Sequence, residues 1–336
     1  MTHWAAMPWR SPEVAPRGAF RLHNRLIGAW RQPARTDRPE LIEGLVAQPA
    51  RIPPKYLYDA VGSALFEAIC ELPEYYLTRT ERAIFVAHRD AIAAAAGRHR
   101  QFVDLGAGDC RKGEWWVDAL APRRFIAVDI STAAVEPALA RMAAAHSDIE
   151  FMGVITDFSR TLDLAGDLDS GPVTFFYPGS SIGNFTPDEA LELLTQIRRL
   201  CGRRGGLLIG VDVPKDEQRL AAAYDDAVGV TAAFNRNVLN HVNALVGCDF
   251  DPAAFRHVAF YNAPASRVEM HLEALRAQCV VLDGSERVFA PGERIHTENS
   301  YKYEPQAFAA LLRRAGFARI AVWRDEAGDF AVYYAE

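Results

Sequence analysis

Strand-like and helix-like segments alternate regularly between Phe102 and Val211, and this alternation limits the possible folds more than any other feature of the chain. The strand-like segments are continuous apolar runs, which are typical of strands buried on both faces of a parallel sheet. Strands are predicted at Phe102–Leu105, Arg124–Ile130, Ile149–Ile155, Val173–Tyr177 and Gly206–Val211. Helices are predicted between them at Glu114–Leu120, Thr132–Ala144 and Pro187–Leu200. The sequence therefore predicts an α/β fold with helices on both faces of the sheet.

The C-terminal segment adds a predicted helix, Pro305–Ala315, and two strands, Ala318–Trp323 and Phe330–Tyr334. The turn between these strands is short enough for a hairpin, so one of the two must run antiparallel to its neighbours. Five parallel strands followed by such a hairpin resemble the class I methyltransferases, whereas dehydrogenase sheets usually lack the hairpin. We therefore predict a Rossmann-like sheet of seven strands that ends in an antiparallel hairpin.

Two other regions depart from the alternation. A long helical region, Glu217–Gly247, is followed by segments of alternating polarity that predict antiparallel strands. Before the sheet, helical spacing predicts helices at Tyr58–Leu72 and Thr78–Ala96. Residues 1–37 are rich in Pro and Arg and predict a partly disordered N-terminal arm. We predict one domain from residues 78–212 and 302–336, and an α+β domain inserted into it from residues 38–77 and 213–301.

The composition of the chain argues against several classes of binding partner. The net charge of −6 argues against a broad nucleic-acid-binding surface, which would be basic. No apolar run reaches the roughly 20 residues of a membrane span. The five cysteines are scattered, without a CxxC pair or a Cys/His cluster, so neither a disulfide framework nor a metal site is predicted. We expect a cytoplasmic monomer that acts on a small molecule, without nucleic acid, membrane or metal.

The stretch DLGAGD, after the first predicted strand, is typical of a nucleotide-type cofactor site. It supplies G-x-G, but Arg111 stands where a dinucleotide site needs a small residue. Asp129 ends the second strand, where a carboxylate can accept from ribose hydroxyls, although a helix N-cap is an equal alternative. Asp157 follows the third strand and can accept from an adenine amino group. These features predict an S-adenosyl-L-methionine pocket (product S-adenosyl-L-homocysteine) made of Asp104, Gly106, Gly108, Lys112, Asp129, Asp157 and Phe158.

Polar residues with a possible substrate role follow the fourth strand and lie near the C-terminus. In YPGSSIGN, Gly179 and Asn184 belong to a polar loop in an apolar setting. In HTENSYKY, Glu298 and Ser300 are two residues apart, so both side chains point to one face if the segment is a strand. A buried carboxylate needs a partner, and an imidazole N–H would be one. The alternative is a surface strand with a solvated glutamate.

The chain resembles the L-histidine Nα-methyltransferases of ergothioneine biosynthesis from about Lys55 to the C-terminus. The most specific match is YDAVGSALF followed by LPEYYLTRTE. The other matching blocks, in the same order as in the family, are DLGAGD, GSSIGN, AYDDAVGVTAAFNRNVL, RVEM and TENSYKY.

The resemblance implies trimethylation of the α-amino group of L-histidine to Nα,Nα,Nα-trimethyl-L-histidine (hercynine), the first step of ergothioneine biosynthesis. It implies that the substrate carboxylate is held by Tyr75, Asn184 and Tyr224. It implies that the amino group lies among Tyr58, Phe66 and the Gly179 carbonyl, which with Asn184 form the catalytic set. It implies an imidazole clamp of Glu298 and Ser300, with Met270 lining the ring pocket. The inserted domain would then bind substrate, and the sheet domain S-adenosyl-L-methionine.

Two other functions remain open from the sequence. The chain could methylate a different amine, such as tryptophan, a histidine derivative or a protein N-terminus. It could also be a binding module that keeps the cofactor pocket without catalysing transfer. The complete set of aromatic and polar acceptor residues argues against the second of these.

Overall fold

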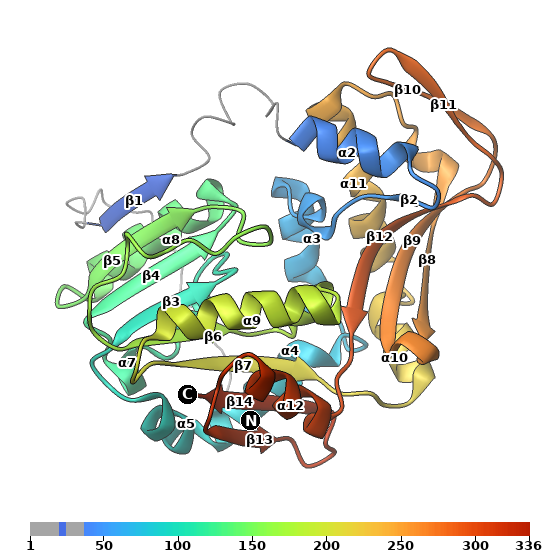
Figure 1. Ribbon diagram of the computed structural model, residues 1–336. Coiled ribbons are helices and arrows are strands. Elements are labelled where there is room, and N and C mark those ends of the chain that lie inside the picture. Colours follow the sequence, from blue (N-terminus) through green and yellow to red (C-terminus); the bar gives the residue numbers. More distant parts are fainter. Residues whose placement is uncertain (1–19, 25–36) are drawn as a thin grey trace.

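The computed structural model describes residues 20–24 and 37–336, and its main element is an eight-stranded sheet (Figure 1). The strand order is β1-β5-β4-β3-β6-β7-β14-β13. Only β14 runs antiparallel to its neighbours, β7 and β13. The predicted parallel sheet with a C-terminal hairpin is therefore confirmed. The strands are β1 (Phe20–Asn24), β3 (Gln101–Leu105), β4 (Arg124–Asp129), β5 (Glu150–Ile155), β6 (Val173–Tyr177), β7 (Gly206–Asp212), β13 (Ile320–Arg324) and β14 (Phe330–Ala335).

The sheet has one strand more than the seven predicted. β1 pairs in parallel with β5 at the edge of the sheet, with Phe20 opposite Phe151. Leu22 packs over Gly153, where a Cβ atom would lie only 2.6 Å from a Leu22 methyl group. The sequence FRLHN did not predict a strand because it lies in a Pro- and Arg-rich stretch and contains no apolar run. The rest of the predicted arm, residues 1–19 and 25–36, lies outside the described residues.

Helices cover both faces of the sheet. Neighbouring residues of one strand pack on opposite sides, so that Phe102 and Val103 belong to different hydrophobic clusters. This explains why the strands read as continuous apolar runs. One face is covered by α4 (Tyr76–Ala87), α5 (Arg89–Ala96), α7 (Val117–Leu120) and α8 (Thr132–Ala145). The other is covered by α9 (Pro187–Cys201) and α12 (Pro305–Arg314).

Two predicted helices are divided in the structure. The segment Thr78–Ala96 is α4 and α5, because the chain leaves helical geometry at His88 (φ −119°, ψ 18°). The segment Glu114–Leu120 contributes to two single-turn helices, α6 (Arg111–Glu114) and α7, separated at Trp115 and Trp116.

A second, four-stranded sheet lies beside the first (Figure 1). Its order is β2-β12-β9-β8, and β9 is antiparallel to both neighbours, which confirms the predicted antiparallel segments. The strands are β2 (Ala50–Arg51), β8 (Phe255–Asn262), β9 (Arg267–Ala274) and β12 (Arg294–Tyr301). The associated helices are α2 (Asp37–Val46), α3 (Ala60–Cys70), α10 (Glu217–Tyr224) and α11 (Val230–Val246).

The helices of this second unit differ from the prediction at their ends. The predicted helix Tyr58–Leu72 begins only at Ala60, because Asp59 is its N-cap and accepts from the Gly62 N–H. Tyr58 therefore lies outside the helix. The predicted helical region Glu217–Gly247 is two helices, α10 and α11. The domain boundaries proposed from the sequence stay a prediction.

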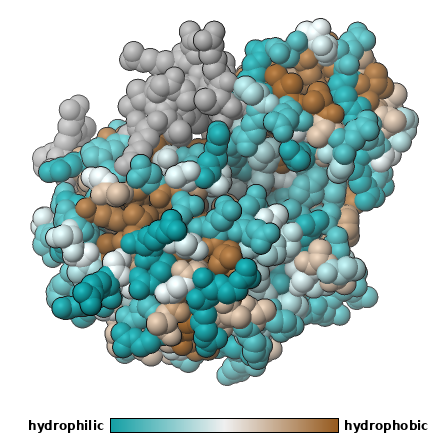
Figure 2. Space-filling view, viewed as in Figure 1, coloured by the Kyte–Doolittle hydropathy of each residue, from teal (hydrophilic) through white to brown (hydrophobic). Residues whose placement is uncertain are grey.

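A hairpin of β10 (Gln278–Leu282) and β11 (Ser285–Phe289) extends from the second unit. Figure 2 shows apolar residues at the surface in the part of the molecule where Figure 1 places α2 and this hairpin. Among residues 20–24 and 37–336, no helix has the combined length and apolar character that crossing a bilayer requires. The expected cytoplasmic location stays a prediction.

Candidate functional site

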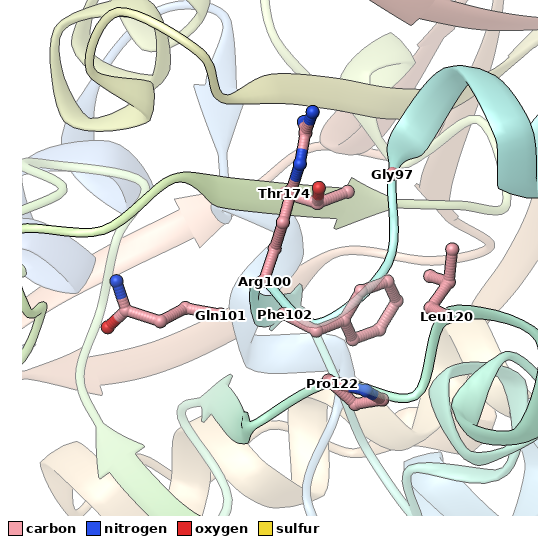
Figure 3. A pocket seen from close by; sticks show the side chains of 7 residues that line it. All are labelled: Gly97, Arg100, Gln101, Phe102, Leu120, Pro122 and Thr174. Atoms are coloured by element: carbon pink, nitrogen blue, oxygen red, sulfur yellow. The ribbon is translucent and has the colours of Figure 1, made fainter.

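The candidate site lies at the carboxyl ends of β3 and β6. The strand order reverses between these two strands, and ligands of open α/β sheets bind outside the carboxyl ends at such a point. Figure 3 shows a small cavity at the opposite end, where Gln101 and Phe102 begin β3. That cavity is therefore not the candidate site.

The glycine loop after β3 leaves open space beside it. Gly106 and Gly108 have positive φ angles of 67° and 51°, and a Cβ atom at either position would meet nothing within 4 Å. Gly108 donates its N–H to Oδ2 of Asp129 over 2.8 Å, and Oδ1 of the same carboxylate accepts from the Ser131 N–H. Ser131, not Asp129, is the N-cap of α8, so the cap alternative for Asp129 is excluded. An open loop beside an anchored carboxylate fits the adenosyl part of S-adenosyl-L-methionine.

Asp104 is buried at the end of β3. Its Oδ2 lies against Gly113, where a Cβ would come within 2.3 Å, and it has no hydrogen-bond partner among the described residues. Burial, followed by the charge of Asp129, raises the pKa of Asp104 well above its usual value and so favours the neutral acid. A neutral carboxylic acid can donate a hydrogen bond as well as accept one.

Asp157 forms an ion pair with a residue that was not predicted from the sequence. Lys55, in the 3-10 helix η1 (Pro54–Leu57), donates to Asp157 Oδ2 over 2.8 Å and also pairs with Glu40. Burial raises the pKa of Asp157, but the hydrogen bonds from Lys55 and Ser159 and the charge of Lys55 together outweigh burial and hold that pKa below its ordinary value. Phe158 packs edge-on against Tyr177, the last residue of β6. The adenine roles of Asp157 and Phe158 stay predictions.

Lys112 connects the cofactor loop with the end of β6. Its Nζ lies 2.9 Å from Oε2 of the buried Glu81, whose Oε1 accepts from the Gly179 N–H over 2.6 Å. Lys112 was predicted at the cofactor site from the sequence, whereas no site role was predicted for Glu81. The TRTE block contains Glu81, yet only the fold shows that α4 carries it to Gly179.

Aromatic rings form a continuous chain through the predicted acceptor site. Tyr58 contacts Phe66 with ring centroids 5.4 Å apart, Phe66 contacts Tyr75 at 6.1 Å, and Tyr75 contacts Tyr224 at 6.2 Å. Phe234 on α11, which was not predicted from the sequence, packs against both Tyr58 and Phe66. Burial raises the pKa values of Tyr58 and Tyr75 well above the usual range, so both phenols stay neutral.

Glu298 and Met270 face each other across β12 and β9. The two residues are direct partners in the strand register, which places the methionine beside the carboxylate. The Glu298 residue is only 7% exposed, and its carboxylate has no hydrogen-bond donor among the described residues. Burial raises the pKa of Glu298 to about 7, against the opposing effect of Lys302. Such a group is only partly ionised near neutral pH and can bind an N–H donor.

Ser300 is bonded to another predicted substrate residue. The Tyr224 hydroxyl donates to Ser300 Oγ over 2.7 Å, although the two were expected at opposite ends of the substrate. Lys302, which was not predicted from the sequence, donates to both hydroxyls over 2.9 and 2.8 Å. Asn184 ends the 3-10 helix η2 (Ser181–Asn184), and a Cβ on the preceding Gly183 would lie 3.4 Å from Ser300 Oγ. The fold therefore brings the predicted carboxylate and imidazole residues into one region.

One cluster of metal-ligand types lies away from this region. Glu269, His271 and His296 have ligand atoms within 4.8 Å of one another. Arg267 pairs with Glu269, and the buried His271 Nδ1 has no partner in the described part of the chain. A metal on His271 Nε2 would force the ring proton onto that unpartnered Nδ1, whereas metal-binding histidines usually donate this N–H. The surroundings therefore do not favour a metal here, and metal-free methyl transfer stays a prediction.

Comparison with known proteins gives consistent matches over most of the chain. A family model described as histidine-specific methyltransferase, SAM-dependent, matches residues 37–336. A protein of Mycolicibacterium smegmatis named histidine N-alpha-methyltransferase is 43% identical over 88% of this chain and 93% of its own length. The protein of the same name from Mycobacterium tuberculosis is 40% identical over the same shares. Ergothioneine biosynthesis protein 1 of Schizosaccharomyces pombe is 27% identical over 88% of this chain but only 40% of its own length.

Proposed function

The chain belongs to the SAM-dependent, histidine-specific methyltransferases, and on this premise we propose that it transfers three methyl groups in turn to the α-amino nitrogen of L-histidine. The product is Nα,Nα,Nα-trimethyl-L-histidine, hercynine, and the reaction is the first step of ergothioneine biosynthesis. The bound S-adenosyl-L-methionine supplies the electrophilic methyl group and leaves as S-adenosyl-L-homocysteine.

The observation that carries this proposal is the environment of Glu298. A carboxylate that is 7% exposed, with no donor among the described residues, can accept a hydrogen bond from a ligand. An imidazole N–H is such a partner, and Met270 across the strand register provides an apolar contact for a flat ring. The pocket therefore favours an amino acid with a ring N–H donor over one with a purely apolar side chain.

The opposite end of the substrate would be held by phenol and amide groups. Tyr75 is a neutral phenol, and Asn184 lies on the η2 segment that packs against β12. The ring of Tyr224 is 6.2 Å from that of Tyr75, but its proton is donated to Ser300, so Tyr75 and Asn184 supply the donors. Phenol O–H and amide N–H groups can bind a carboxylate by hydrogen bonds. With both ends held, the amino nitrogen is aligned for in-line displacement, which is what this reaction chiefly requires.

The amino group would lie against the aromatic chain. Each methylation produces a larger ammonium ion that must lose a proton before the next transfer. Tyr58, Phe66 and Phe234 contact one another pairwise, with ring centroids 5.4, 5.5 and 6.0 Å apart, and aromatic ring faces attract such a cation. The neutral Tyr58 phenol lacks the basicity of a phenolate near pH 7, so we propose that solvent water takes the proton.

The test is mass spectrometry of L-histidine incubated with the protein and S-adenosyl-L-methionine. Mono-, di- and trimethylated histidine are expected in sequence, with the trimethylated form accumulating. Tryptophan, histamine and a peptide with an N-terminal histidine serve as competing acceptors. The proposed function fails if one of these amines is methylated while histidine is not.

A further inference from the structure

Lys302 lies where the two sheets meet. It directly follows β12, and its side chain, with no exposed area, forms an ion pair with Asp212 at the end of β7 over 2.8 Å. The other two contacts of its ammonium group are the Tyr224 hydroxyl at 2.9 Å and Ser300 Oγ at 2.8 Å. An ammonium group has three protons and no lone pair, so Lys302 is a saturated donor.

The direction of these hydrogen bonds determines what Ser300 can do. A hydroxyl oxygen accepts at two positions and donates one proton. Ser300 Oγ accepts from Lys302 and from the Tyr224 hydroxyl, so both acceptor positions are used. Its own proton has no acceptor among the described residues and remains available to a ligand. Ser300 is therefore a donor, and Glu298, on the same face of β12, is the adjacent acceptor.

We propose that Lys302 is a positioning residue that fixes the Tyr224–Ser300 pair as a donor beside the Glu298 acceptor, so that the pocket selects a ring with one acceptor and one donor. This inference rests on the proposed function, because neutral imidazole is such a ring: one nitrogen carries a proton and the other a lone pair. Imidazolium, with two N–H donors, would direct one of them at the Ser300 proton.

The charge of Lys302 is maintained by the same contacts. Burial alone lowers the pKa of a lysine, but Asp212 and the Tyr224 hydroxyl outweigh burial and hold the pKa of Lys302 above its usual value. The ammonium therefore keeps all three protons near pH 7 and can only donate hydrogen bonds. A neutral amine in its place could accept from Ser300 and turn the Ser300 proton away from the ligand.

A matched control for Lys302 is present in the same network. Lys215 donates to Asp212 Oδ1 over 2.6 Å and to the Tyr76 hydroxyl over 2.7 Å, but no hydrogen bond joins it to Tyr224 or Ser300 among the described residues. Tyr76 also donates to Asp212 Oδ2, so that oxygen keeps a donor when Lys302 is replaced. Lys302→Met and Lys215→Met thus each remove one buried cation from Asp212. Only Lys302→Met also removes the hydrogen bonds to the Tyr224 and Ser300 hydroxyls.

The experiment measures KM for histidine and kcat for wild type, Lys302→Met, Lys215→Met, Ser300→Ala and the double variant Lys302→Met/Ser300→Ala. We expect Lys302→Met to raise KM about tenfold or more, as for loss of one charged hydrogen bond, with a much smaller change in kcat. Lys215→Met should leave KM within about twofold of wild type, within the error of comparing neighbouring variants. The double variant should be no worse than Ser300→Ala, since Lys302 acts through that hydroxyl.

Three results overturn the inference. KM could rise equally in Lys302→Met and Lys215→Met, or stay unchanged in Lys302→Met. The rise in KM of the double variant could also equal the product of the rises in the two single variants. Melting temperature and S-adenosyl-L-homocysteine binding verify that each variant is folded. Should Lys302→Met be recovered unfolded, Lys302→Gln, which keeps an amide donor without the charge, replaces it in the same cycle. A wild-type protein that yields no methylated histidine overturns the proposed function. If the wild type is active but the rise in KM of the double variant is the product of the two single rises, only the role of Lys302 is overturned.

Discussion

The carboxylate of Glu81 accepts a hydrogen bond from the backbone N–H of Gly179 over 2.6 Å and so joins helix α4 to the loop after β6. Its second oxygen is paired with Lys112 on the cofactor side. The contact is possible because residue 210 on β7 is glycine: a Cβ atom there would lie 2.0 Å from Glu81 Oε1. The Gly179 peptide, whose carbonyl we assign to the amino group of the substrate, is therefore held by a residue from a different part of the chain.

The first prediction concerns Gly210→Ala. The added methyl group displaces the Glu81 carboxylate from the Gly179 N–H, so we expect the free energy of unfolding to fall by about 1–3 kcal/mol and kcat to fall with it. Urea unfolding and steady-state kinetics measure the two effects. Gly166→Ala is the control, because a Cβ at Gly166 meets nothing within 4 Å. Unchanged kcat in Gly210→Ala would show that Glu81 does not position the Gly179 peptide.

The second prediction is that Glu298→Gln stabilises the protein at high pH. Because burial raises the pKa of Glu298 from 4.5 to about 7, the folded state keeps a proton that the unfolded state loses, and its stabilising contribution disappears as the pH rises through this window. The glutamine variant lacks this loss, so its stability should rise relative to wild type by about 2 kcal/mol between pH 5 and pH 8. Urea unfolding at both pH values measures the difference.

Glu273→Gln is the control for that experiment. The hydrogen bond from Arg294, followed by that from Arg256, lowers the pKa of Glu273 from 4.5, so its contribution to stability is lost only at lower pH and Glu273→Gln should show no relative gain between pH 5 and pH 8. The same Glu298→Gln protein should bind histidine more weakly than wild type at pH 8, since an amide accepts less strongly than a carboxylate. If Glu298→Gln is no more stable than wild type at pH 8 relative to pH 5, burial does not raise the pKa of Glu298 as described.

The third prediction concerns the cofactor. Asp129 accepts from two backbone N–H groups, and in Asp129→Asn the amide NH₂ must face one of them. We expect the Kd for S-adenosyl-L-homocysteine to rise about ten- to a hundredfold, equivalent to roughly 1–3 kcal/mol. Isothermal calorimetry measures it, with the exposed Asp118→Asn as control. Equal affinities of the two variants would place the ribose elsewhere.

The fourth prediction concerns product distribution. Phe66 contacts Tyr58, Tyr75 and Phe234, so Phe66→Leu removes one ring from the predicted ammonium site. A cation–π contact contributes about 0.5–2 kcal/mol, and the last transfer produces the permanent cation. We therefore expect dimethylhistidine to accumulate in time courses followed by mass spectrometry.

Phe85→Leu is the control for product distribution, because Phe85 belongs to a different aromatic group, with Trp115, Trp116 and Phe176. A trimethyl fraction lowered equally in both variants would indicate loss of stability and not loss of a cation site.

The sequence predicted the parts of the fold that depend on local pattern. Apolar runs located β3, β4, β5, β6 and β7 because each is buried on both faces of the sheet. Strand β1 was missed because three of its five residues, Arg21, His23 and Asn24, are polar and its pairing depends on β5, more than a hundred residues later. The break at His88 was also missed, since helical spacing continues across it.

The site could be predicted only where residues of known chemistry stood in recognisable blocks. The sequence indicated Glu298 and Ser300, and the structure places Met270 opposite Glu298. It did not indicate Lys302 and Asp212, which are 90 positions apart and form a pair only after the two sheets meet. Lys55 was missed for the same reason, because its partner Asp157 is 102 positions away.

Strand β1 has a consequence for handling the protein. Without it, the outer side of β5 would present unpaired N–H and C=O groups along six residues, which is a ready template for a strand from another molecule. A shortened protein that starts after Asn24 should therefore tend to self-associate into aggregates even though its catalytic groups are intact, and light scattering during concentration would reveal it.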